Sequence, residues 1–312
     1  MKTIILSSET KLTTPCVATI GSFDGVHRGH QLVVRLLIDR AKRQGLSPVV
    51  ITFDRQPRQL FDQDFRPQLL STLEEKASCL QALGIETLVV LPFTKEMAAL
   101  SAEAFMRQVL RCQLNVQVLL TGYDNRFGHN RSEGFDDYVR YGKAMEMEVV
   151  RGDVELMDGA TAVSSTAIRR LLSDEGRVDL MPDVLTRYYA LSGHIVPGEH
   201  IGHELGFPTA NLAPDDPFKL IPASGVYAVW ASIADGGRMP AMMNIGTRPT
   251  FEGHRQTLEV HILKEVGDIY GQTLTVEFVS RLRSERRFDS REALVEQLRQ
   301  DRESVFALLE SL

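Results

Sequence analysis

Residues 21–31 read GSFDGVHRGHQ, a stretch with three glycines and two histidines where a strand ends and a helix begins. A β-rich run, CVATIG (16–21), precedes it, and a helical pattern, HQLVVRLLIDRAKRQG (30–45), follows it. Glycines at a strand-to-helix turn let the backbone approach a ligand closely, and the free N–H groups of the next helix can bind an anion. His27 and His30 add side-chain donors at the same place. The stretch therefore predicts a phosphate-binding turn.

The residues alone leave two alternative roles open for these histidines. They could be surface side chains after a tight turn, or they could be zinc ligands. Against zinc, no carboxylate or cysteine stands nearby at a convincing ligand spacing. The chain has no G-x-x-x-x-G-K-[ST] motif, and this turn lacks G-x-G-x-x-G, so neither common nucleotide loop accounts for it.

Strand and helix patterns alternate through the first half. Thr72 and Glu75 have the spacing of a helix capping box, and Gly45 and Gly84 stand where helices would end. This rhythm predicts a mostly parallel sheet covered on both faces, with ligands beyond the carboxyl ends of its strands. The further segments expected in this half are strands at 48–53, 87–93 and 115–122 and helices at 72–84 and 101–112.

The pattern changes near residue 185. Short strand-like runs with many turns extend from 193 to 278, and ADGGR (234–238) separates two of them as a hairpin turn would. Closely spaced antiparallel strands predict a barrel, and residues 290–312 predict a terminal amphipathic helix capped by Ser290. The fold class is therefore α/β plus all-β, a Rossmann-like parallel-sheet domain at 1–184 followed by a β-barrel domain with a terminal helix at 185–312.

The composition is that of a globular protein, with 312 residues, 43% of them hydrophobic and 24% charged. The net charge of −6 argues weakly against a nucleic-acid partner. Cys16, Cys79 and Cys112 form no C-x-x-C pair and suit a reducing compartment. No apolar run reaches the roughly 18 residues of a membrane span, and the N-terminus has no signal-peptide core. We expect a cytoplasmic protein without a membrane partner.

A second candidate motif, VSSTAIRR, occupies residues 163–170. Its three hydroxyl side chains precede a helical run, and Arg169 adds a cation; alone, such a sequence is more often a plain N-cap. Paired with H-x-G-H, it resembles the signatures of the nucleotidyltransferase superfamily, whose members transfer AMP or CMP from a nucleoside triphosphate. The resemblance implies that ATP binds at Gly21, Phe23, Asp24, His27, His30, Ser164, Ser165, Thr166 and Arg169.

The second half carries its own candidate residues. GFPTANL (206–212) presents Thr209 and Asn211, whose hydroxyl and amide oxygens suit Mg²⁺. Glu259 and His261 alternate with apolar neighbours, so they share one face of a strand. A carboxylate held inside a small barrel is a good general base for an alcohol, whereas the alternative is that both residues line the solvent face.

Six segments of this half, GFPTANL, GVYAV, MNIGTRPTF, LEVHIL, DIYG and RLRSERRF, closely resemble riboflavin kinase. With the H-x-G-H domain before them, the chain resembles the bacterial bifunctional riboflavin kinase/FMN adenylyltransferase (FAD synthetase) family from about residue 15 to 308. The resemblance implies two ATP-dependent steps, phosphorylation of riboflavin to FMN and adenylylation of FMN to FAD with release of pyrophosphate. It also implies Mg²⁺, and no obligate protein partner is evident.

Roles in the adenylyltransferase half follow from the same resemblance. His27 and His30 match the phosphate-binding histidines, and Arg169 matches the triphosphate cation. GYDNRFG (122–128) resembles the flavin-side loop of the family. The FMN-binding residues implied by this loop are Asp124, Asn125 and Phe127.

In the kinase half, Glu259 matches the general base that takes the proton of the ribityl 5′-hydroxyl. Thr209 and Asn211 match the Mg²⁺-linked pair. The arginines of RLRSERRF (281–288) could be a solvated face or could touch a ligand. The kinase ATP site is expected at Gly198, Gly202, His203, Thr209, Asn211 and Asn244.

The sequence departs from the family pattern at three places. Arg55 replaces a proline of the F-x-P-x-P pattern, Asn125 replaces the usual aromatic of the flavin-side loop, and His203 stands where many relatives carry Arg or Lys. Because the first two lie in the adenylyltransferase half, the alternative function is a riboflavin kinase with a degenerate adenylyltransferase half. A flavin-sensing regulator would need a nucleic-acid-binding segment or basic patch, and the sequence shows none.

Overall fold

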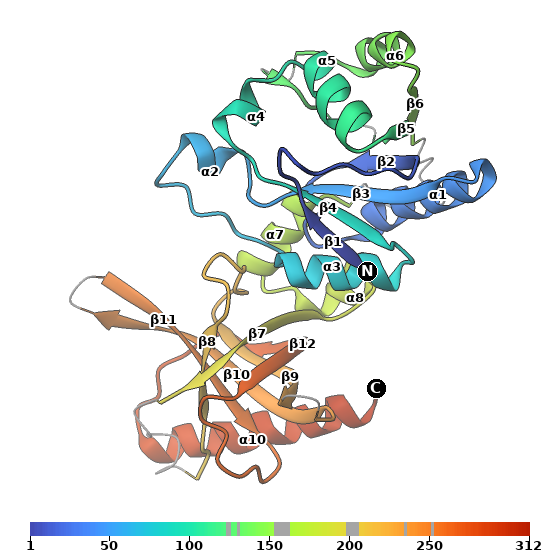
Figure 1. Cartoon of the computed structure of the whole chain (residues 1–312). Helices are drawn as coiled ribbons and strands as arrows, with labels where there is room; N and C mark the ends of the chain where they lie inside the picture. Colours follow the sequence, from blue (N-terminus) through green and yellow to red (C-terminus); the bar gives the residue numbers. More distant parts are fainter. Residues whose placement is uncertain (123–125, 130–131, 153–162, 198–205, 234–235, 251–252) are drawn as a thin grey trace. The chain divides into compact units, whose positions relative to one another are not determined.

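A computed structural model of the chain describes residues 1–122, 126–129, 132–152, 163–197, 206–233, 236–250 and 253–312. Contacts between residues divide the chain into two compact units, Met1–Ser165 and Thr166–Leu312 (Figure 1). In the described parts of the chain, no helix combines the length and the apolar character needed to cross a membrane.

The first unit contains a six-stranded sheet in which every pair of neighbouring strands is parallel. The strand order is β1-β4-β3-β2-β5-β6, so the order reverses beside β2, which pairs with β3 on one edge and β5 on the other. Ligands of parallel sheets bind at such a reversal. The sequence patterns missed the two edge strands, which are only four residues long. The strands are β1 (Lys2–Ile5), β2 (Cys16–Ile20), β3 (Ser47–Phe53), β4 (Thr87–Leu91), β5 (Val116–Thr121) and β6 (Glu148–Arg151).

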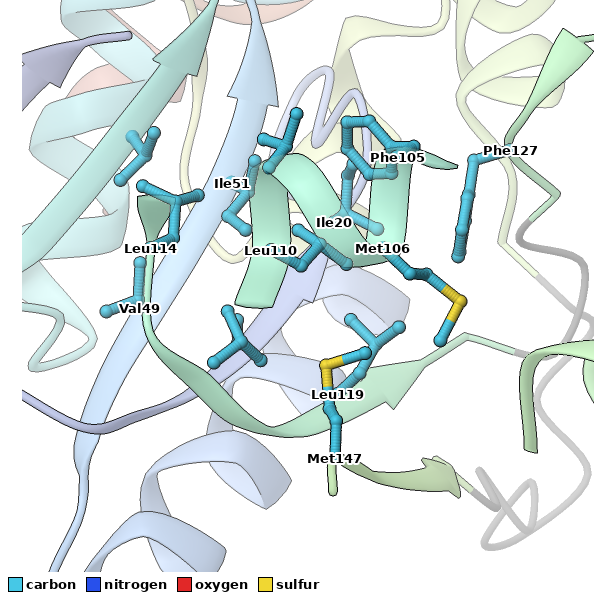
Figure 2. Close-up of a cluster of buried hydrophobic side chains, with 14 of the residues drawn as sticks. Ile20, Val49, Ile51, Phe105, Met106, Leu110, Leu114, Leu119, Phe127 and Met147 are labelled. Atoms are coloured by element: carbon cyan, nitrogen blue, oxygen red, sulfur yellow. The ribbon is translucent and has the colours of Figure 1, made fainter. Parts of the chain in front are cut away.

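Helices bury both faces of this sheet, as the alternation predicted. In β3, Ile51 packs on one face with Leu110 (Figure 2). Val50 packs on the other face with Leu37, because successive side chains of a strand point to opposite faces. One face is covered by α1 (Arg28–Gln44) and α3 (Leu73–Ala82), and the other by α5 (Ala102–Phe105), the π-helical segment η1 (Met106–Gln113) and α6 (Phe135–Ala144). Short helices α2 (Arg58–Phe61) and α4 (Lys95–Ala99) lie in the connections.

Local sequence signals set the ends of these elements. The hydroxyl of Thr72 accepts a hydrogen bond from the backbone N–H of Glu75 at 3.2 Å, and the Glu75 carboxylate accepts from the N–H of Thr72 at 3.0 Å. The predicted capping box is thus confirmed. Gly45 ends α1 with φ of 65°, a left-handed conformation that favours glycine. The strand expected at 87–93 stops before Pro92, which has no N–H to donate to a neighbouring strand.

The second unit contains the predicted barrel, which is closed and has six strands with antiparallel neighbours in the order β10-β11-β8-β7-β12-β9. The antiparallel pairing of β9 with β10 confirms that the two runs flanking ADGGR pair as a hairpin, while residues 234–235 of the connection lie outside the described residues. The barrel strands are β7 (Tyr189–Val196), β8 (Ala210–Pro214), β9 (Gly225–Ile233), β10 (Met239–Thr250), β11 (Gly253–Ile262) and β12 (Thr273–Arg283). Before the barrel lie α7 (Ser165–Ser173), η3 (Val178–Leu180) and α8 (Met181–Leu185).

The terminal helix α10 (Arg291–Glu310) packs on the outside of this barrel. Val305 and Leu309 of the helix share a buried cluster with Met242 of β10. The Ser290 hydroxyl accepts from the N–H of Ala293 at 3.1 Å, which confirms the predicted cap.

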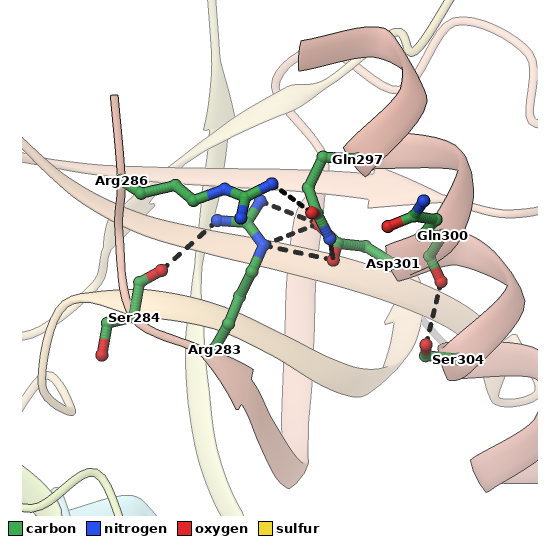
Figure 3. Close-up of polar contacts among 7 residues, drawn as sticks. All are labelled: Arg283, Ser284, Arg286, Gln297, Gln300, Asp301 and Ser304. Carbon is green, nitrogen blue, oxygen red and sulfur yellow. Dashed lines mark hydrogen bonds and ion pairs between the residues drawn. The ribbon is translucent and has the colours of Figure 1, made fainter. Parts of the chain in front are cut away.

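Arginines at the end of β12 and just after it contact protein groups (Figure 3). Arg283 donates from Nε and Nη2 to the Asp301 carboxylate of α10, with distances of 3.1, 3.0 and 2.7 Å. Arg286 donates to the side-chain oxygen of Gln297, and Gln297 donates to Asp301 at 2.7 Å. These contacts join the end of β12 to the terminal helix, so Arg283 and Arg286 are not merely a solvated face.

Candidate active sites

The turn after β2 has an unusual backbone. Phe23, Gly25 and Val26 adopt positive φ angles of 47°, 80° and 42°. This region is unfavourable for a β-branched residue such as valine. Phe23 and Val26 are only 3% and 0% exposed, and both join the core on the α1 face of the sheet. Burial of these two side chains therefore holds the turn in shape.

Asp24 fixes the turn to two other segments. Its carboxylate oxygen Oδ1 accepts from the N–H groups of Leu70 and Ser71 at 3.0 and 3.1 Å. The Ser71 hydroxyl accepts from the N–H of Gly25 at 2.9 Å. The backbone carbonyl of Asp24 accepts from the Ser165 hydroxyl at 3.0 Å. Because Ser165 opens α7, the second sequence motif begins beside the turn of the first.

The two histidines stack on each other with ring centroids 3.7 Å apart and planes at 21°. Burial lowers the pKa of His27 to about 4, a shift that Asp24 partly opposes. Burial, then His27 and Lys76, lower the pKa of His30 well below 6.5. Both Nδ1 atoms are buried without a hydrogen-bond partner among the described residues. Near neutral pH the pair is therefore uncharged, with hydrogen-bonding capacity left for a ligand.

Packing explains why residue 29, between the two histidines, is a glycine. A Cβ built at Gly29 would lie 3.2 Å from the His27 ring and 3.8 Å from the Val163 carbonyl oxygen. The start of VSSTAIRR thus lies against the H-x-G-H segment. Ser164 and Thr166 are exposed at the start of α7. Arg169 is half-buried one helical turn after Ser165.

A cavity of about 360 Å³ opens at the carboxyl edge of the sheet. It begins at Gly21 and is walled by aromatic side chains, with Phe53 and Phe93 in edge-to-face contact at 5.5 Å. Its lining includes the ends of β2 and β3 and the segments that follow β4 and β5, which is the place expected of a ligand site in this sheet. The lining residues are Ile20, Gly21, Ser22, Phe53, Pro57, Phe93, Met97, Ala98, Leu100, Phe105, Arg126, Phe127 and Gly128.

Phe127, expected to bind FMN, belongs to this cavity and is 7% exposed. It stacks on Tyr138 of α6 with ring centroids 4.2 Å apart. The Tyr138 hydroxyl accepts from the Phe127 N–H at 3.0 Å. Tyr138 therefore orients the loop that carries Phe127. Asp124 and Asn125, the other two residues expected there, lie outside the described residues.

In the barrel, three candidate residues are neighbours on three adjacent strands. Glu259 of β11 stands directly opposite Asn244 of β10 on one side and Asn211 of β8 on the other. Directly opposed residues of antiparallel strands project from the same face of the sheet. Strand register therefore brings Asn211, Glu259 and Asn244 together, although 48 residues separate the first two in sequence (259 minus 211).

The sequence left open whether Glu259 lies inside the barrel or on its outer face, and the structure places it on the outer face. Its neighbours Leu258 and Val260 are 5% and 1% exposed, whereas Glu259 and His261 are half-buried. His261 pairs with Met242, which packs against the outer helix α10. Because β11 alternates faces, Glu259 is on the outer face of the barrel wall. The predicted sharing of one face by Glu259 and His261 is confirmed.

A second cavity, of about 940 Å³, lies beside this face and includes Thr209. His261 fixes its edge, because its Nδ1 lies 2.7 Å from the Pro208 carbonyl oxygen, which can only accept. Burial lowers the pKa of His261, and the bond to Pro208 opposes that shift. Arg302 of α10 lies over the ring of Phe207, 5.9 Å from its centroid, at the same edge. Gly198, Gly202 and His203 lie outside the described residues.

Sequence analysis missed several residues of these sites. Phe53 and Phe93 end the runs ITF and LPF, and an aromatic residue at the end of a buried strand was an available signal. Lys76 lies between Leu73 and Leu80 on the buried stripe of α3, where a charged residue is rare. Glu285 was also missed; its carboxylate oxygen would lie 2.9 Å from a Cβ at Gly246.

The fold and both candidate sites define a two-part enzyme, with a candidate anion-binding turn at the switch point of a parallel sheet and a carboxylate–amide cluster on a closed barrel. Residues 9–167 match the family model described as FAD synthetase. The model described as riboflavin kinase matches residues 185–309.

Whole-chain relatives agree with the two family models. A bifunctional riboflavin kinase/FMN adenylyltransferase of Escherichia coli K12 is 36% identical over 288 residues, covering 92% of this chain and 90% of the relative. The Pseudomonas fluorescens protein of the same name is 38% identical over 89% of this chain and 88% of its own length. A Streptococcus pneumoniae crystal structure, named as a macrolide-efflux protein, superposes with a TM-score of 0.87 at 31% identity, covering 97% and 98% of the two chains.

This chain belongs to the family of bifunctional riboflavin kinase/FMN adenylyltransferases. The resemblance inferred from H-x-G-H, GFPTAN and NIGTRPTF is thereby confirmed. The efflux name belongs to the pneumococcal structure, whereas both family models and both bacterial relatives carry the names of flavin enzymes.

Proposed function

We propose that this protein makes FAD from riboflavin in two ATP-dependent reactions. The riboflavin kinase domain, at 185–312, phosphorylates riboflavin to FMN, and the adenylyltransferase domain, at 1–184, joins FMN to AMP with release of pyrophosphate. The observation that carries the proposal is the presence of both matched domains in one chain, each with a formed candidate site. Nothing favours the alternative of a kinase with a degenerate adenylyltransferase half.

For adenylyl transfer, a phosphate oxygen of FMN forms a bond to the α-phosphorus of ATP, and the bond from that phosphorus to the bridging oxygen breaks. Two anions must meet, so positioning and charge stabilisation supply most of the catalysis. His27 and His30 bind phosphate oxygens, and Arg169 adds positive charge. Gly21, Phe23 and Asp24 shape the turn, while Ser164, Ser165 and Thr166 present hydroxyls.

The aromatic cavity at the edge of the sheet supports a flavin site for the same reaction. Its volume of about 360 Å³ and its aromatic lining suit a flat, mostly apolar ring system. The cavity begins at Gly21, beside the turn that would hold the reacting phosphates. Phe127 forms part of its wall, and we assign Asp124 and Asn125 to the same FMN site from the family resemblance alone.

For riboflavin phosphorylation, Glu259 is the general base. It removes the proton of the ribityl 5′-hydroxyl, whose oxygen forms a bond to the γ-phosphorus of ATP while the bond from that phosphorus to the β–γ bridging oxygen breaks and ADP leaves. Although Glu259 is on the outer barrel face, it is half-buried and stands between Asn211 and Asn244, and this cluster of polar candidate residues supports the role. We place the ATP in the cavity beside Thr209, and we assign Gly198, Gly202 and His203 to the same ATP site from the family resemblance alone.

Magnesium fits the residues of the kinase site. The Thr209 hydroxyl and the Asn211 amide carbonyl are hard oxygen ligands, and the carboxylate of Glu259 stands directly across from Asn211. Mg²⁺ bound there would neutralise phosphate charge. We further propose that the protein acts in the cytoplasm on riboflavin, FMN and ATP without a protein partner. Its three cysteines are all free, which supports a reducing compartment.

A product time course tests the two activities. Purified protein is incubated with riboflavin, ATP and Mg²⁺, and riboflavin, FMN and FAD are separated at intervals. FMN rising first and FAD following is the expected result. FMN accumulating without FAD, even when FMN is supplied, would contradict the adenylyltransferase half and support the alternative.

Two substitutions test the assignment of residues to sites. Glu259→Gln should abolish riboflavin phosphorylation and leave the conversion of supplied FMN to FAD intact. His30→Ala should do the reverse. Each variant is the control for the other, because each must retain one full activity. If either change removed both activities from a folded protein, the assignment of separate sites would be wrong.

A further inference from the structure

Lys76 is a buried cation that none of the roles above uses. It lies on α3 and is 8% exposed, between Leu73 and Leu80 on the buried side of the helix. Burying a lysine is costly unless a partner compensates its charge. Packing of the helix alone therefore does not explain why a lysine occupies this position.

The ammonium group of Lys76 is connected to the phosphate turn. It donates to the Thr52 hydroxyl at 3.2 Å. Thr52, which is fully buried near the end of β3, donates in turn to the Ser22 carbonyl oxygen at 3.1 Å. The chain of two hydrogen bonds ties α3 to the backbone of GSFDG. A single hydroxyl proton sets its direction, because the Thr52 oxygen donates to Ser22 and can only accept from Lys76.

The charge of Lys76 acts on the same site. Burial lowers the pKa of Lys76, and Asp24 opposes that shift. Lys76 in turn helps to lower the pKa of His30. Among the described residues, the titratable groups that act on His30 are His27 and Lys76, while Asp24 acts on His27 and Lys76. A phosphate arriving at the turn would bring further negative charge, beside that of Asp24, to the positive charge of Lys76.

We propose that Lys76 is a positioning residue of the adenylyltransferase site, which holds the phosphate turn through Thr52 and places a buried positive charge near His30. This inference rests on the proposed adenylyltransferase function. In it, His30 stays an uncharged hydrogen-bond donor while Lys76 supplies the positive charge. The lysine transfers no proton and makes no bond to the nucleotide.

Lys76→Met tests the proposal, because methionine keeps the length of the side chain and removes its charge. FAD formation from supplied FMN and ATP is measured in the full-length protein. We expect kcat/KM for ATP to fall about 10- to 100-fold, as for a lost charge near developing phosphate charge. Riboflavin phosphorylation in the same sample, and the exposed-lysine variant Lys11→Met, should be unchanged.

A second readout separates positioning from a merely structural role. In Lys76→Met, the pKa of His30, followed by NMR of the labelled imidazole, should rise toward its ordinary value because a repelling cation is gone. An unchanged titration of His30 would overturn the proposed charge effect. Adenylyl transfer within twofold of the wild type would overturn the proposal altogether.

Thr52→Val covers the case in which Lys76→Met fails to fold. It keeps the lysine and the shape of the threonine but removes the link to Ser22, so we expect a loss of about 3- to 10-fold in the same kcat/KM. An unaffected Thr52→Val protein would overturn the proposed link. If the wild-type protein itself made no FAD from FMN, the proposed function would fall instead, whatever the variants did.

Discussion

The contact between Arg283 and Asp301 gives the sharpest test of how the barrel holds its terminal helix. The two side chains are 18% and 5% exposed, and three hydrogen bonds of 2.7 to 3.1 Å join them (Figure 3). Asp301→Asn removes the charge of the carboxylate and turns one of its two acceptor oxygens into an NH2 donor, while size and helix propensity stay similar. It leaves the Arg283 cation in a mostly buried place without its counter-charge.

The expected cost follows from that burial. Removing one member of a fully buried ion pair costs about 3–5 kcal/mol. Arg283 keeps some access to water, and asparagine keeps one acceptor oxygen, so we expect a loss of about 2 kcal/mol. For a unit of this size, that corresponds to a fall in Tm of about 4–8 °C.

The assay is equilibrium unfolding in urea, followed by the fluorescence of Trp230. This residue is the only tryptophan of the chain and packs in the cluster beneath α10, so it reports on the second unit. Glu296→Gln is the matched control, because its partner Arg299 lies on the same helix and both side chains are about 60% exposed (59% and 61%). The control should lose less than about 0.5 kcal/mol. A loss in Asp301→Asn no larger than the control's would refute the reasoning.

Three further predictions concern the first unit. The pKa of His27 is about 4 in the folded protein and 6.5 ordinarily, so between these pH values only the unfolded chain binds the proton. The free energy of unfolding should therefore fall by up to about 3 kcal/mol as the pH drops from 6.5 to 4. Unfolding followed by circular dichroism should show a shallower fall in His27→Asn. Gly128→Ala should lower the free energy of unfolding in urea by more than about 2 kcal/mol, because φ is +92° and the new Cβ would lie 2.6 Å from the backbone nitrogen of Ala102. The control Gly134→Ala, whose Cβ meets nothing within 4 Å, should lower it by less than about 1 kcal/mol. Phe93→Leu should raise KM for FMN about 3- to 10-fold without changing riboflavin phosphorylation, and an unchanged KM would exclude the aromatic cavity as the flavin site.

Helix caps, which depend on a few neighbouring residues, could be predicted from the sequence. The capping box of Thr72, the left-handed Gly45 and the Ser290 cap all lie where their local patterns put them. The edge strands β1 and β6 were missed because each is four residues long and pairs on one side only, which leaves a weak alternation. The face on which a strand residue lies was harder to predict than the strand itself. Alternation showed that Glu259 and His261 share one face of β11, but not whether that face is inside or outside the barrel.

The family, the two fold classes and the candidate site residues could be predicted from the sequence, because motifs and hydrophobic periods are properties of neighbouring residues. Which distant residues meet became visible only in the folded chain. Register across β8, β11 and β10 puts Glu259 between two asparagines. The hydrogen bond from Ser165 to Asp24 spans 141 positions of sequence, and the one from Lys76 joins a helix to a strand end. Such contacts depend on strand pairing and packing between separate elements, which no local pattern encodes.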